Sequence, residues 1–267
     1  MKGRVLICAG SDSGGGAGIQ ADIKTVTALG GFATTAITAL TAQNTLGVFG
    51  VLDVPPAFIA QQMELVLDDI GTDAVKTGML SKPEVIETIV ATLERLAPDA
   101  PVVVDPVMVA KGGHKLLDDA AHQALLHRLL PRATLLTPNL PEAEALTGLS
   151  VTDPEAMAEA GRMLRNFGAG AVLVKGGHLD RAEVIDVLVH AGGTELFTYP
   201  RIESSSTHGT GCTLSSAIAT GLAQGRDLRA AIGMALAYVR EAIRRAPGLG
   251  KGHGPLDHTH PLRDTNT

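Results

Sequence analysis

Residues 207–213 combine glycines with hydroxyl and thiol side chains, directly before an apolar segment. Gly209 and Gly211 allow a tight turn that leaves backbone amides exposed. The apolar residues that follow recur at steps of four, which predicts the buried face of a helix (Leu214, Ile218 and Leu222). The first amides of a helix lack intrahelical partners, and the helix dipole adds partial positive charge. The segment therefore predicts a binding site for a phosphate or a carboxylate.

Cys212 lies within this segment, where the first turn of a helix is expected to lower the pKa of a thiol. A glycine turn before an ordinary core helix has the same pattern, and for the turn taken alone that interpretation is favoured. The other polar clusters of the chain decide between the two.

Carboxylate and lysine side chains follow three other apolar segments. Asp105 comes directly after residues 102–104, Glu142 lies beyond residues 134–136, and Lys175 stands between four apolar residues and two glycines. Carboxylates at such positions can hold Mg²⁺ through water and phosphate oxygens, although each alone is more typical of a helix cap or a surface charge. A cation, a helix N-terminus and a carboxylate-held Mg²⁺ are together the parts that phosphoryl transfer requires.

The glycine-rich loop 10–18 follows the first apolar segment and invites a dinucleotide-binding interpretation. That interpretation is weak, because position 19 is Ile where the fingerprint needs Gly, and the next strand ends in Thr41 instead of an acid. No Walker A motif occurs in the sequence either. The loop therefore predicts close approach of the backbone to a small ligand, with Asp22 one helical turn further along.

Apolar strands and amphipathic helices alternate along the chain. Strands are predicted over 5–9, 34–40, 48–54, 73–76, 102–104, 134–136 and 171–174, with an edge hairpin over 184–190 and 195–199. Helices are predicted over 19–29, 59–70, from 83 on, 120–130, from 141 on, 156–167, 213–224 and 228–245. This order predicts an α/β fold with a parallel sheet covered on both faces. Ligands bind at the carboxyl ends of such strands, where the loops 10–18 and 41–44 and the polar residues lie.

No internal repeat and no linker rich in Pro or Ser interrupts this alternation. We therefore expect one domain over residues 1–267. Residues 258–267 are expected to form a surface tail, since His258 and His260 lack further metal ligands at a suitable spacing.

Composition narrows the function classes. Hydrophobic residues make up 45% and charged residues 19% of the chain, which is typical of a globular protein. A formal net charge of -6, the lack of a basic run and an aromatic content of 3% argue against nucleic-acid binding. No apolar segment approaches the length of a membrane span. Cys8 and Cys212 lack metal-binding spacing and indicate a reduced, cytoplasmic protein.

Several motifs occur in a fixed order along nearly the whole chain. They are the glycine-rich 10–22, Thr-Ala-Gln-Asn at 41–44, Lys-Thr-Gly-Met at 76–79, Val-Asp-Pro-Val-Met at 104–108, Thr-Pro-Asn-Leu-Pro-Glu at 137–142, Val-Lys-Gly-Gly-His at 174–178, Thr-His-Gly-Thr-Gly-Cys-Thr at 207–213 and Gly-His-Gly-Pro-Leu-Asp at 252–257. This set resembles the hydroxymethylpyrimidine/phosphomethylpyrimidine kinases of thiamine biosynthesis, which belong to the ribokinase-like superfamily. The resemblance implies a ribokinase-like three-layer αβα fold with a mostly parallel central sheet. The chain departs from it at 204–206, where three serines stand and members often have Asn just before the motif at 207–213.

The resemblance implies ATP-dependent phosphorylation of 4-amino-5-hydroxymethyl-2-methylpyrimidine and then of its monophosphate. Gln43 is implied to bond the pyrimidine ring, in a pocket lined also by Gly10, Asp22, Met79 and Val107. An amide offers a donor and an acceptor together, which matches the amino group and ring nitrogen of an aminopyrimidine.

On the phosphate side, the resemblance implies an Mg²⁺ and phosphate element of Asn139 and Glu142, with Asp105 nearby. Lys175 and Thr207 are implied to lie near the ATP phosphates, Lys175 with a catalytic role. The anion hole for the transferring group is implied to consist of Gly209, Thr210, Gly211 and Cys212. The resemblance also implies a homodimer. Whether the reaction needs a monovalent cation stays open.

Other functions stay open at this stage. A pyridoxal kinase has the same fold and a similar heteroaromatic hydroxymethyl substrate. Cys212 and His208 could instead be the nucleophile and base of a thiol hydrolase, although Asp105, Glu142 and Lys175 have no part in such a reaction. A non-catalytic, pyrimidine-binding regulator is the third alternative.

Overall fold

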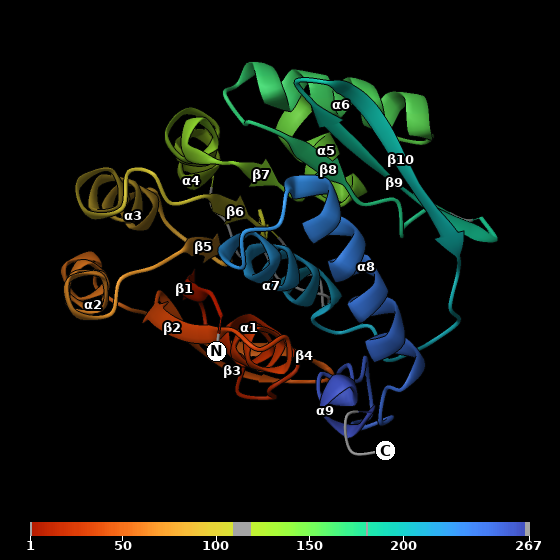
Figure 1. The fold of residues 1–267 in the computed structure, drawn as a ribbon, viewed down its shortest axis with the longest axis horizontal. Helices are drawn as coiled ribbons and strands as arrows, with labels where there is room; N and C mark the ends of the chain where they lie inside the picture. Colours follow the sequence, from red (N-terminus) through yellow and green to blue (C-terminus); the bar gives the residue numbers. More distant parts are fainter. Residues whose placement is uncertain (1, 109–118, 180, 265–267) are drawn as a thin grey trace.

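The predicted strands assemble into one large sheet. The computed structural model describes residues 2–108, 119–179 and 181–264. Within them the strand order is β10-β9-β8-β7-β6-β5-β1-β2 (Figure 1). The bounds are β1 (Arg4–Ala9), β2 (Phe32–Ile37), β5 (Ala74–Thr77), β6 (Val102–Val104), β7 (Leu135–Leu136), β8 (Val172–Val174), β9 (Glu183–His190) and β10 (Gly193–Pro200).

Most neighbouring strands of this sheet are parallel. The pairs from β2 through β1, β5, β6 and β7 to β8 are parallel, whereas β8–β9 and β9–β10 are antiparallel. Strands β5 to β8 are buried along their whole length, because helices cover both faces and no polar face is needed. The predicted α/β class and the edge hairpin are confirmed.

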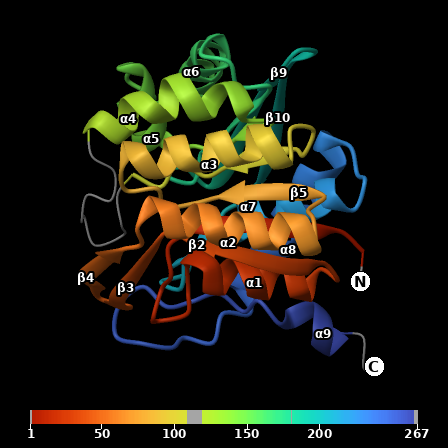
Figure 2. The same cartoon turned by 90° about the vertical axis from the view of Figure 1, so that its left-hand side faces the viewer.

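Helices form one layer on each face of the sheet (Figures 1 and 2). One layer contains α1 (Gly18–Ala28), α7 (Thr210–Ala223) and α8 (Leu228–Arg244), whose apolar residues share one core with β1. The other contains α2 (Pro56–Asp69), α3 (Pro83–Leu96), α4 (Asp119–Ala124), α5 (Leu140–Thr147) and α6 (Pro154–Asn166). The helix predicted over 120–130 is divided, since α4 passes into the π-helical η1 (Leu125–Leu129) and the 3₁₀ turn η2 (Leu130–Arg132). Within the described ranges, none of the helices combines the length and hydrophobicity that a bilayer crossing requires.

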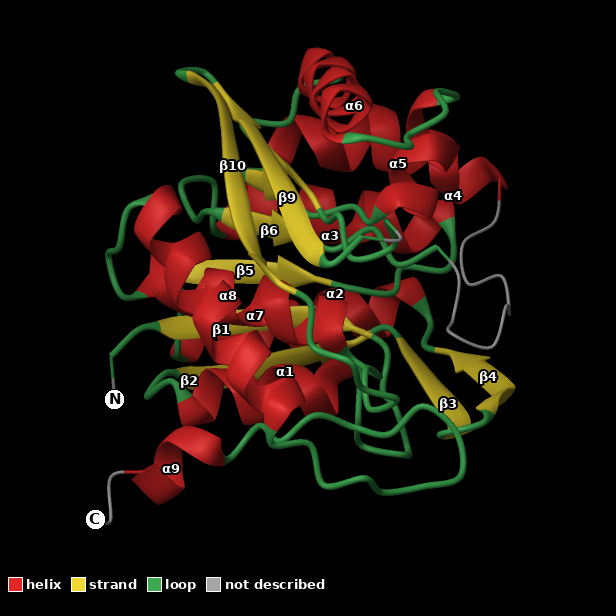
Figure 3. Cartoon of the chain, turned by 90° about the vertical axis from the view of Figure 1, so that its right-hand side faces the viewer, coloured by secondary structure: helices red, strands yellow, loops and turns green. Residues whose placement is uncertain are grey.

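A separate two-stranded sheet projects from the main body (Figures 2 and 3). It pairs β3 (Ala39–Asn44) with β4 (Gly47–Asp53) in antiparallel register. The single strand predicted over 34–40 is therefore wrong, and residues 41–44 form a strand where a loop was expected. The break falls at Thr38, whose backbone amide donates to Ala9 and whose hydroxyl donates to the carbonyl of Met79. These bonds to the main sheet turn the chain, which propensity alone does not reveal.

The predicted surface tail, 258–267, is wrong for His258 and His260, which pack into the fold, whereas Thr259, Leu262 and Arg263 are exposed; residues 265–267 lie outside the described ranges. His258 and His260 are buried, and His260 begins the short helix α9 (His260–Asp264). The Tyr238 hydroxyl donates to the backbone oxygen of His258 at 2.8 Å, and the His260 Nε2 donates to the carbonyl of Tyr238 at 3.2 Å. Tyr238 of α8 thus binds the backbone of His258 and the imidazole of His260, while the imidazole of His258 lies 3.0 Å from the Thr213 hydroxyl of α7.

Candidate active site

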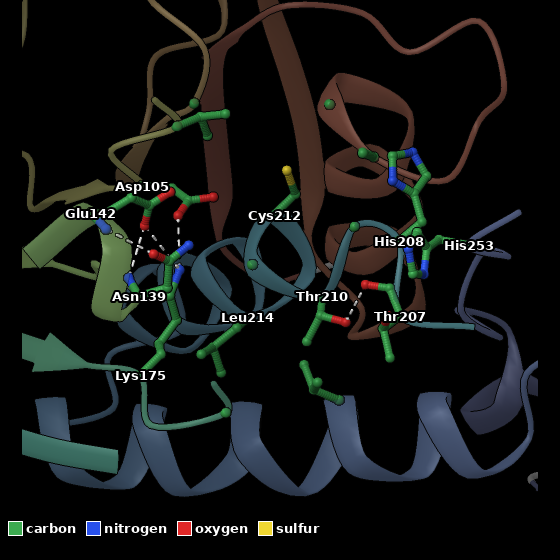
Figure 4. A pocket seen from close by; sticks show the side chains of 18 of the residues that line it. Asp105, Asn139, Glu142, Lys175, Thr207, His208, Thr210, Cys212, Leu214 and His253 are labelled. Carbon is green, nitrogen blue, oxygen red and sulfur yellow. Dashed lines mark hydrogen bonds and ion pairs between the residues drawn. The ribbon is translucent and has the colours of Figure 1, made fainter. Parts of the chain in front are cut away.

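A cavity of about 1250 Å³ opens at the carboxyl ends of the parallel strands. Figure 4 shows side chains that line it. The cavity brings together nearly all of the site residues expected from the sequence: Gly10, Gln43, Met79, Asp105, Val107, Asn139, Glu142, Lys175, Thr207, Gly209, Thr210, Gly211 and Cys212. Asp22 is not among its lining residues.

The turn before α7 has the geometry that its glycines predict. Gly209 is the N-cap residue of α7, with a φ of 80°. A Cβ at this position would lie 1.8 Å from the carbonyl oxygen of Gly16, so the close approach of the two loops requires glycine. The Thr210 hydroxyl donates to the carbonyl of Thr207 at 2.8 Å and holds the turn closed. The first amides of α7 therefore lie at the cavity with the positive end of the helix dipole.

Lys175, Asp105 and Glu142 form a charged cluster beside this turn (Figure 4). The Lys175 Nζ lies 3.2 Å from Asp105 Oδ1 and 4.0 Å from Glu142 Oε2. A Cβ added to Gly211 would lie 3.3 Å from the same Nζ, so the lysine adjoins the first turn of α7. Cation, carboxylates and helix N-terminus therefore share one wall of the cavity.

Asn139 and Glu142 close the start of α5 as a reciprocal cap. The backbone amide of Glu142 donates to the Asn139 Oδ1, and the Glu142 Oε2 accepts from the backbone amide of Asn139. Burial raises the pKa of Glu142 to about 7, against the lowering effect of the Lys175 charge. The cap fixes the position of the Glu142 carboxylate. The three-residue spacing of Asn139 and Glu142 that allows it is visible in the sequence.

Four of the five substrate residues implied by the resemblance also line the cavity. A Cβ added to Gly10 would lie 3.2 Å from the Met79 Sδ, which shows how closely these two residues pack. Gln43 reaches the cavity from β3, and Val107 reaches it from the segment after β6.

Asp22 lies outside the cavity in a buried ion pair. Its side chain is fully buried, and its two oxygens lie 2.9 and 2.8 Å from the Lys76 Nζ. The Ser216 hydroxyl donates to the same carboxylate at 2.6 Å. The expectation that Asp22 lines the pocket is thus not met, because Lys76 and Ser216 draw its carboxylate beneath the site. Lys76 was missed, although a lysine inside an apolar strand is a signal in the sequence.

Cys212 differs from the expectation in its acidity. Burial raises the pKa of its thiol from 9.0 to about 12, and the Lys76 charge offsets only part of this effect. The predicted lowering by the helix N-terminus is therefore wrong, because desolvation of the thiolate outweighs it.

The thiol hydrolase alternative requires a bond between Cys212 and His208. Among the described residues, the polar contacts of the His208 ring are its bond to Asp12 Oδ2 at 2.8 Å and the approach of the Gln43 Nε2 to its Nε2 at 3.2 Å. A nucleophile and base pair is thus not formed. Asp12 was not among the expected site residues.

The sequence model of the family described as phosphomethylpyrimidine kinase matches residues 12–257. The chain belongs to this family. The thiamine biosynthesis bifunctional protein ThiED of Geobacter sulfurreducens is 56% identical to this chain over 263 residues. That match covers 98% of this chain but only 54% of the relative, so the chain spans about half of that protein. A hydroxymethylpyrimidine/phosphomethylpyrimidine kinase of Streptomyces coelicolor is 47% identical, with 95% of this chain and 93% of the relative covered.

Solved structures of related kinases have the same fold. A phosphomethylpyrimidine kinase from Clostridium difficile has a TM-score of 0.80 and 44% identity, with 91% of this chain and 100% of that chain covered. An ADP complex of Bacillus subtilis pyridoxal kinase has a TM-score of 0.91 and 36% identity, with 98% and 99% covered. The family assignment rests on the family model and on the relatives in sequence. The pyridoxal kinase is a structural neighbour with the same fold.

Proposed function

We propose that this protein transfers a phosphoryl group from ATP to 4-amino-5-hydroxymethyl-2-methylpyrimidine, and then a second one to the monophosphate, in thiamine biosynthesis. One observation carries the proposal: Lys175, the first turn of α7 and two carboxylates meet on one wall of a cavity that Gln43 also lines. Phosphoryl transfer depends mainly on positioning and on stabilising charge, which is what this wall supplies. The names of the relatives agree with the same reaction. We also propose that one domain, 1–267, carries it.

On the phosphate wall, the amides of Gly209, Gly211 and Cys212 form the anion hole for the transferring group, with Thr210 closing the turn. Lys175 and Thr207 lie on the side of the ATP phosphates. An ATP-using kinase is what the family indicates, and an ADP complex of a structural neighbour supports nucleotide binding in this fold.

The same wall fits Mg²⁺. Asp105 and Glu142 offer hard carboxylate oxygens on one wall, whereas the described residues contain no group of three His, Cys, Asp or Glu side chains that would make an all-protein metal site. Mg²⁺ prefers this arrangement, since it keeps several waters and binds through one or two carboxylates and substrate phosphates. When bound, the ion would neutralise phosphate charge, while Asn139 holds Glu142 in place.

On the substrate side, Gln43 bonds the ring, and Gly10, Met79 and Val107 line the pocket around it. Asp22 has an indirect part, because it fixes the Lys76 ammonium beneath the site.

A homodimer is also part of the proposal. The β3–β4 hairpin and α2 carry exposed large apolar side chains, which are typical of an interaction surface (Leu46, Phe49, Leu52, Phe58 and Leu65). Covering them with a second copy would remove this surface from water. The cytoplasmic location expected from Cys8 and Cys212 stays a prediction.

Pyridoxal kinase is the second candidate, favoured by the TM-score of 0.91 to such an enzyme. A mass-spectrometric assay with ATP and Mg²⁺, offering hydroxymethylpyrimidine and pyridoxal side by side, separates the two. We expect the monophosphate and then the diphosphate of the pyrimidine. Formation of pyridoxal phosphate alone would contradict the proposal and assign the pocket to pyridoxal.

A further inference from the structure

Behind Gln43, the cavity wall holds a buried aspartate and a histidine to which the proposed function gives no task. Asp12 is only 2% exposed. Its Oδ2 accepts from the amides of Gly16 and Ala17 at 3.0 and 2.8 Å, and its Oδ1 accepts from the amide of Gly14 at 2.7 Å. Burial acts to raise the pKa of Asp12, but the bonds from His208 and these amides hold it below its usual value. At neutral pH the carboxylate is therefore ionised and can only accept hydrogen bonds.

This acceptor fixes the proton on His208. The His208 Nε2 lies 2.8 Å from Asp12 Oδ2. Because the carboxylate has no proton to donate, Nε2 carries one, whether the imidazole is neutral or charged. The ring is also held in place, since a Cβ on Gly16 would lie 2.6 Å from its Cδ2 and its backbone amide donates to Gly254. His208 therefore holds one Nε2 proton at a fixed position, directed at Asp12 Oδ2, and a further acceptor beside Nε2 can only share it.

Gln43 meets this N–H with its side-chain amide. The Gln43 Nε2 lies 3.2 Å from the His208 Nε2, and its Oε1 lies 3.2 Å from the Thr41 Oγ1, whose own proton goes to the Ser11 carbonyl at 2.8 Å. At the His208 end, the Gln43 nitrogen faces a nitrogen whose proton is directed at Asp12 and which therefore cannot accept. At the other end, the Thr41 hydroxyl has its shorter bond to Ser11 and can only share that proton with Gln43 Oε1. A half-turn of the amide keeps its shape, brings Oε1 to the His208 N–H as a second acceptor beside Asp12 Oδ2, and lets Nε2 donate to the Thr41 Oγ1.

We propose that Asp12 and His208 are positioning residues that lock the Gln43 amide with its oxygen toward the anion hole and its nitrogen toward Thr41. The direction follows from the chain, because His208 directly precedes Gly209 of the anion-hole turn. The lock selects substrates by the order of donor and acceptor along the ring edge.

The substrate of the proposed function, on which this inference rests, has the matching order. Its amino group stands on the ring carbon next to the one that bears the hydroxymethyl group, and a ring nitrogen follows. With the hydroxymethyl group at the anion hole, the amino group donates to the Gln43 Oε1, and the ring nitrogen accepts from its Nε2. In the 4-oxo analogue the order is reversed, because a carbonyl replaces the amino group and the ring nitrogen carries a proton. That analogue needs the amide turned back, with two donors facing each other at His208.

The test compares kcat/KM for the amino compound and the 4-oxo analogue. We expect the wild-type protein to prefer the amino compound by roughly 100-fold or more, as polar sites do when a substrate leaves their groups unpaired. His208→Leu removes the N–H, so the amide can turn and the preference should fall about tenfold. His208→Gln places an amide nitrogen near the former Nε2 and should restore it. Lys24→Gln is the matched control, because it removes a 2.8 Å bond to Gly15 of the same loop and should leave the preference unchanged.

Equal use of both compounds by the wild-type protein would overturn the lock, since it means that the amide turns freely. A wild-type preference that survives in His208→Leu would also overturn it; His208→Asn, too short to reach Gln43, replaces that variant if it does not fold. Failure of the wild-type protein to phosphorylate the amino compound at all would instead overturn the proposed function, and this inference with it.

Discussion

The buried imidazole of His258 should make the stability of this protein depend on pH below neutrality. Its side chain is 3% exposed, and its Nε2 lies 3.0 Å from the Thr213 hydroxyl. Burial, helped by the Lys24 charge, lowers the pKa of His258 from 6.5 to about 4 in the folded protein. The unfolded chain binds a proton as the pH falls below 6.5, while the folded protein resists until about 4. The stabilisation is therefore complete above 6.5 and is lost between these values.

The size of the effect follows from the two pKa values. A difference of roughly 2.5 units, at about 1.36 kcal/mol per unit, corresponds to about 3 kcal/mol. Urea unfolding at pH 7 and pH 4 measures it in the wild-type protein and in His258→Gln. Glutamine keeps a nitrogen near the Thr213 hydroxyl but has no group that titrates in this range. The carboxylates titrate alike in both proteins, so the wild-type protein should lose about 3 kcal/mol more than the variant. Equal losses within about 1 kcal/mol would refute the assignment of a neutral, buried imidazole.

Three further predictions concern the site. Lys76→Met leaves the carboxylate of Asp22 buried without its ion-pair partner, so the free energy of unfolding should fall by about 3–5 kcal/mol. Adding Asp22→Asn should recover most of this loss in urea unfolding, and purely additive losses would contradict the pairing. For Cys212, a pKa of about 12 against an ordinary 9.0 predicts that iodoacetamide alkylates it roughly a thousandfold more slowly than a free thiol at pH 7.5. Mass spectrometry follows the reaction, and rapid labelling would show that the thiolate is populated. If Cys212 accepts the substrate proton, Cys212→Ser slows phosphorylation of the alcohol more than that of the monophosphate, and equal loss in both steps would exclude that role.

Local patterns predicted most of the sheet, because each strand is a short apolar segment bounded by turn residues. The β9–β10 hairpin is an example, since Gly192 and Gly193 mark its turn in the sequence. Residues 34–44 were less predictable. The break between β2 and β3 depends on bonds from Thr38 to Ala9 and Met79, and the latter is 41 positions away in the chain.

The site could be predicted where its residues follow strands, and less well where burial and distant partners decide. Asp105 and Lys175 stand at the carboxyl ends of β6 and β8, parallel strands on either side of β7, so the fold class places both at the same edge of the sheet. Asp22 and His258 have no comparable signal. Asp22 pairs with Lys76, and His258 is enclosed by Thr213 and α8. The position of each side chain therefore depends on contacts that form only when distant segments pack.

Cys212 shows why the acidity of a group is harder to predict than its position. The sequence correctly places the thiol at the start of a helix beside a cavity. The helix N-terminus and the Lys76 charge favour the thiolate, but burial disfavours it more, and only the packed structure gives the balance.

In the proposed reaction a thiol that stays protonated can donate a hydrogen bond to the transferring group, together with the amides of the turn. The second substrate is a phosphate already largely ionised near neutral pH, so it has no proton to lose to a base. One anion hole can therefore serve an alcohol and a phosphate as acceptors, because its main task in both steps is to stabilise the charge of the same transferring group.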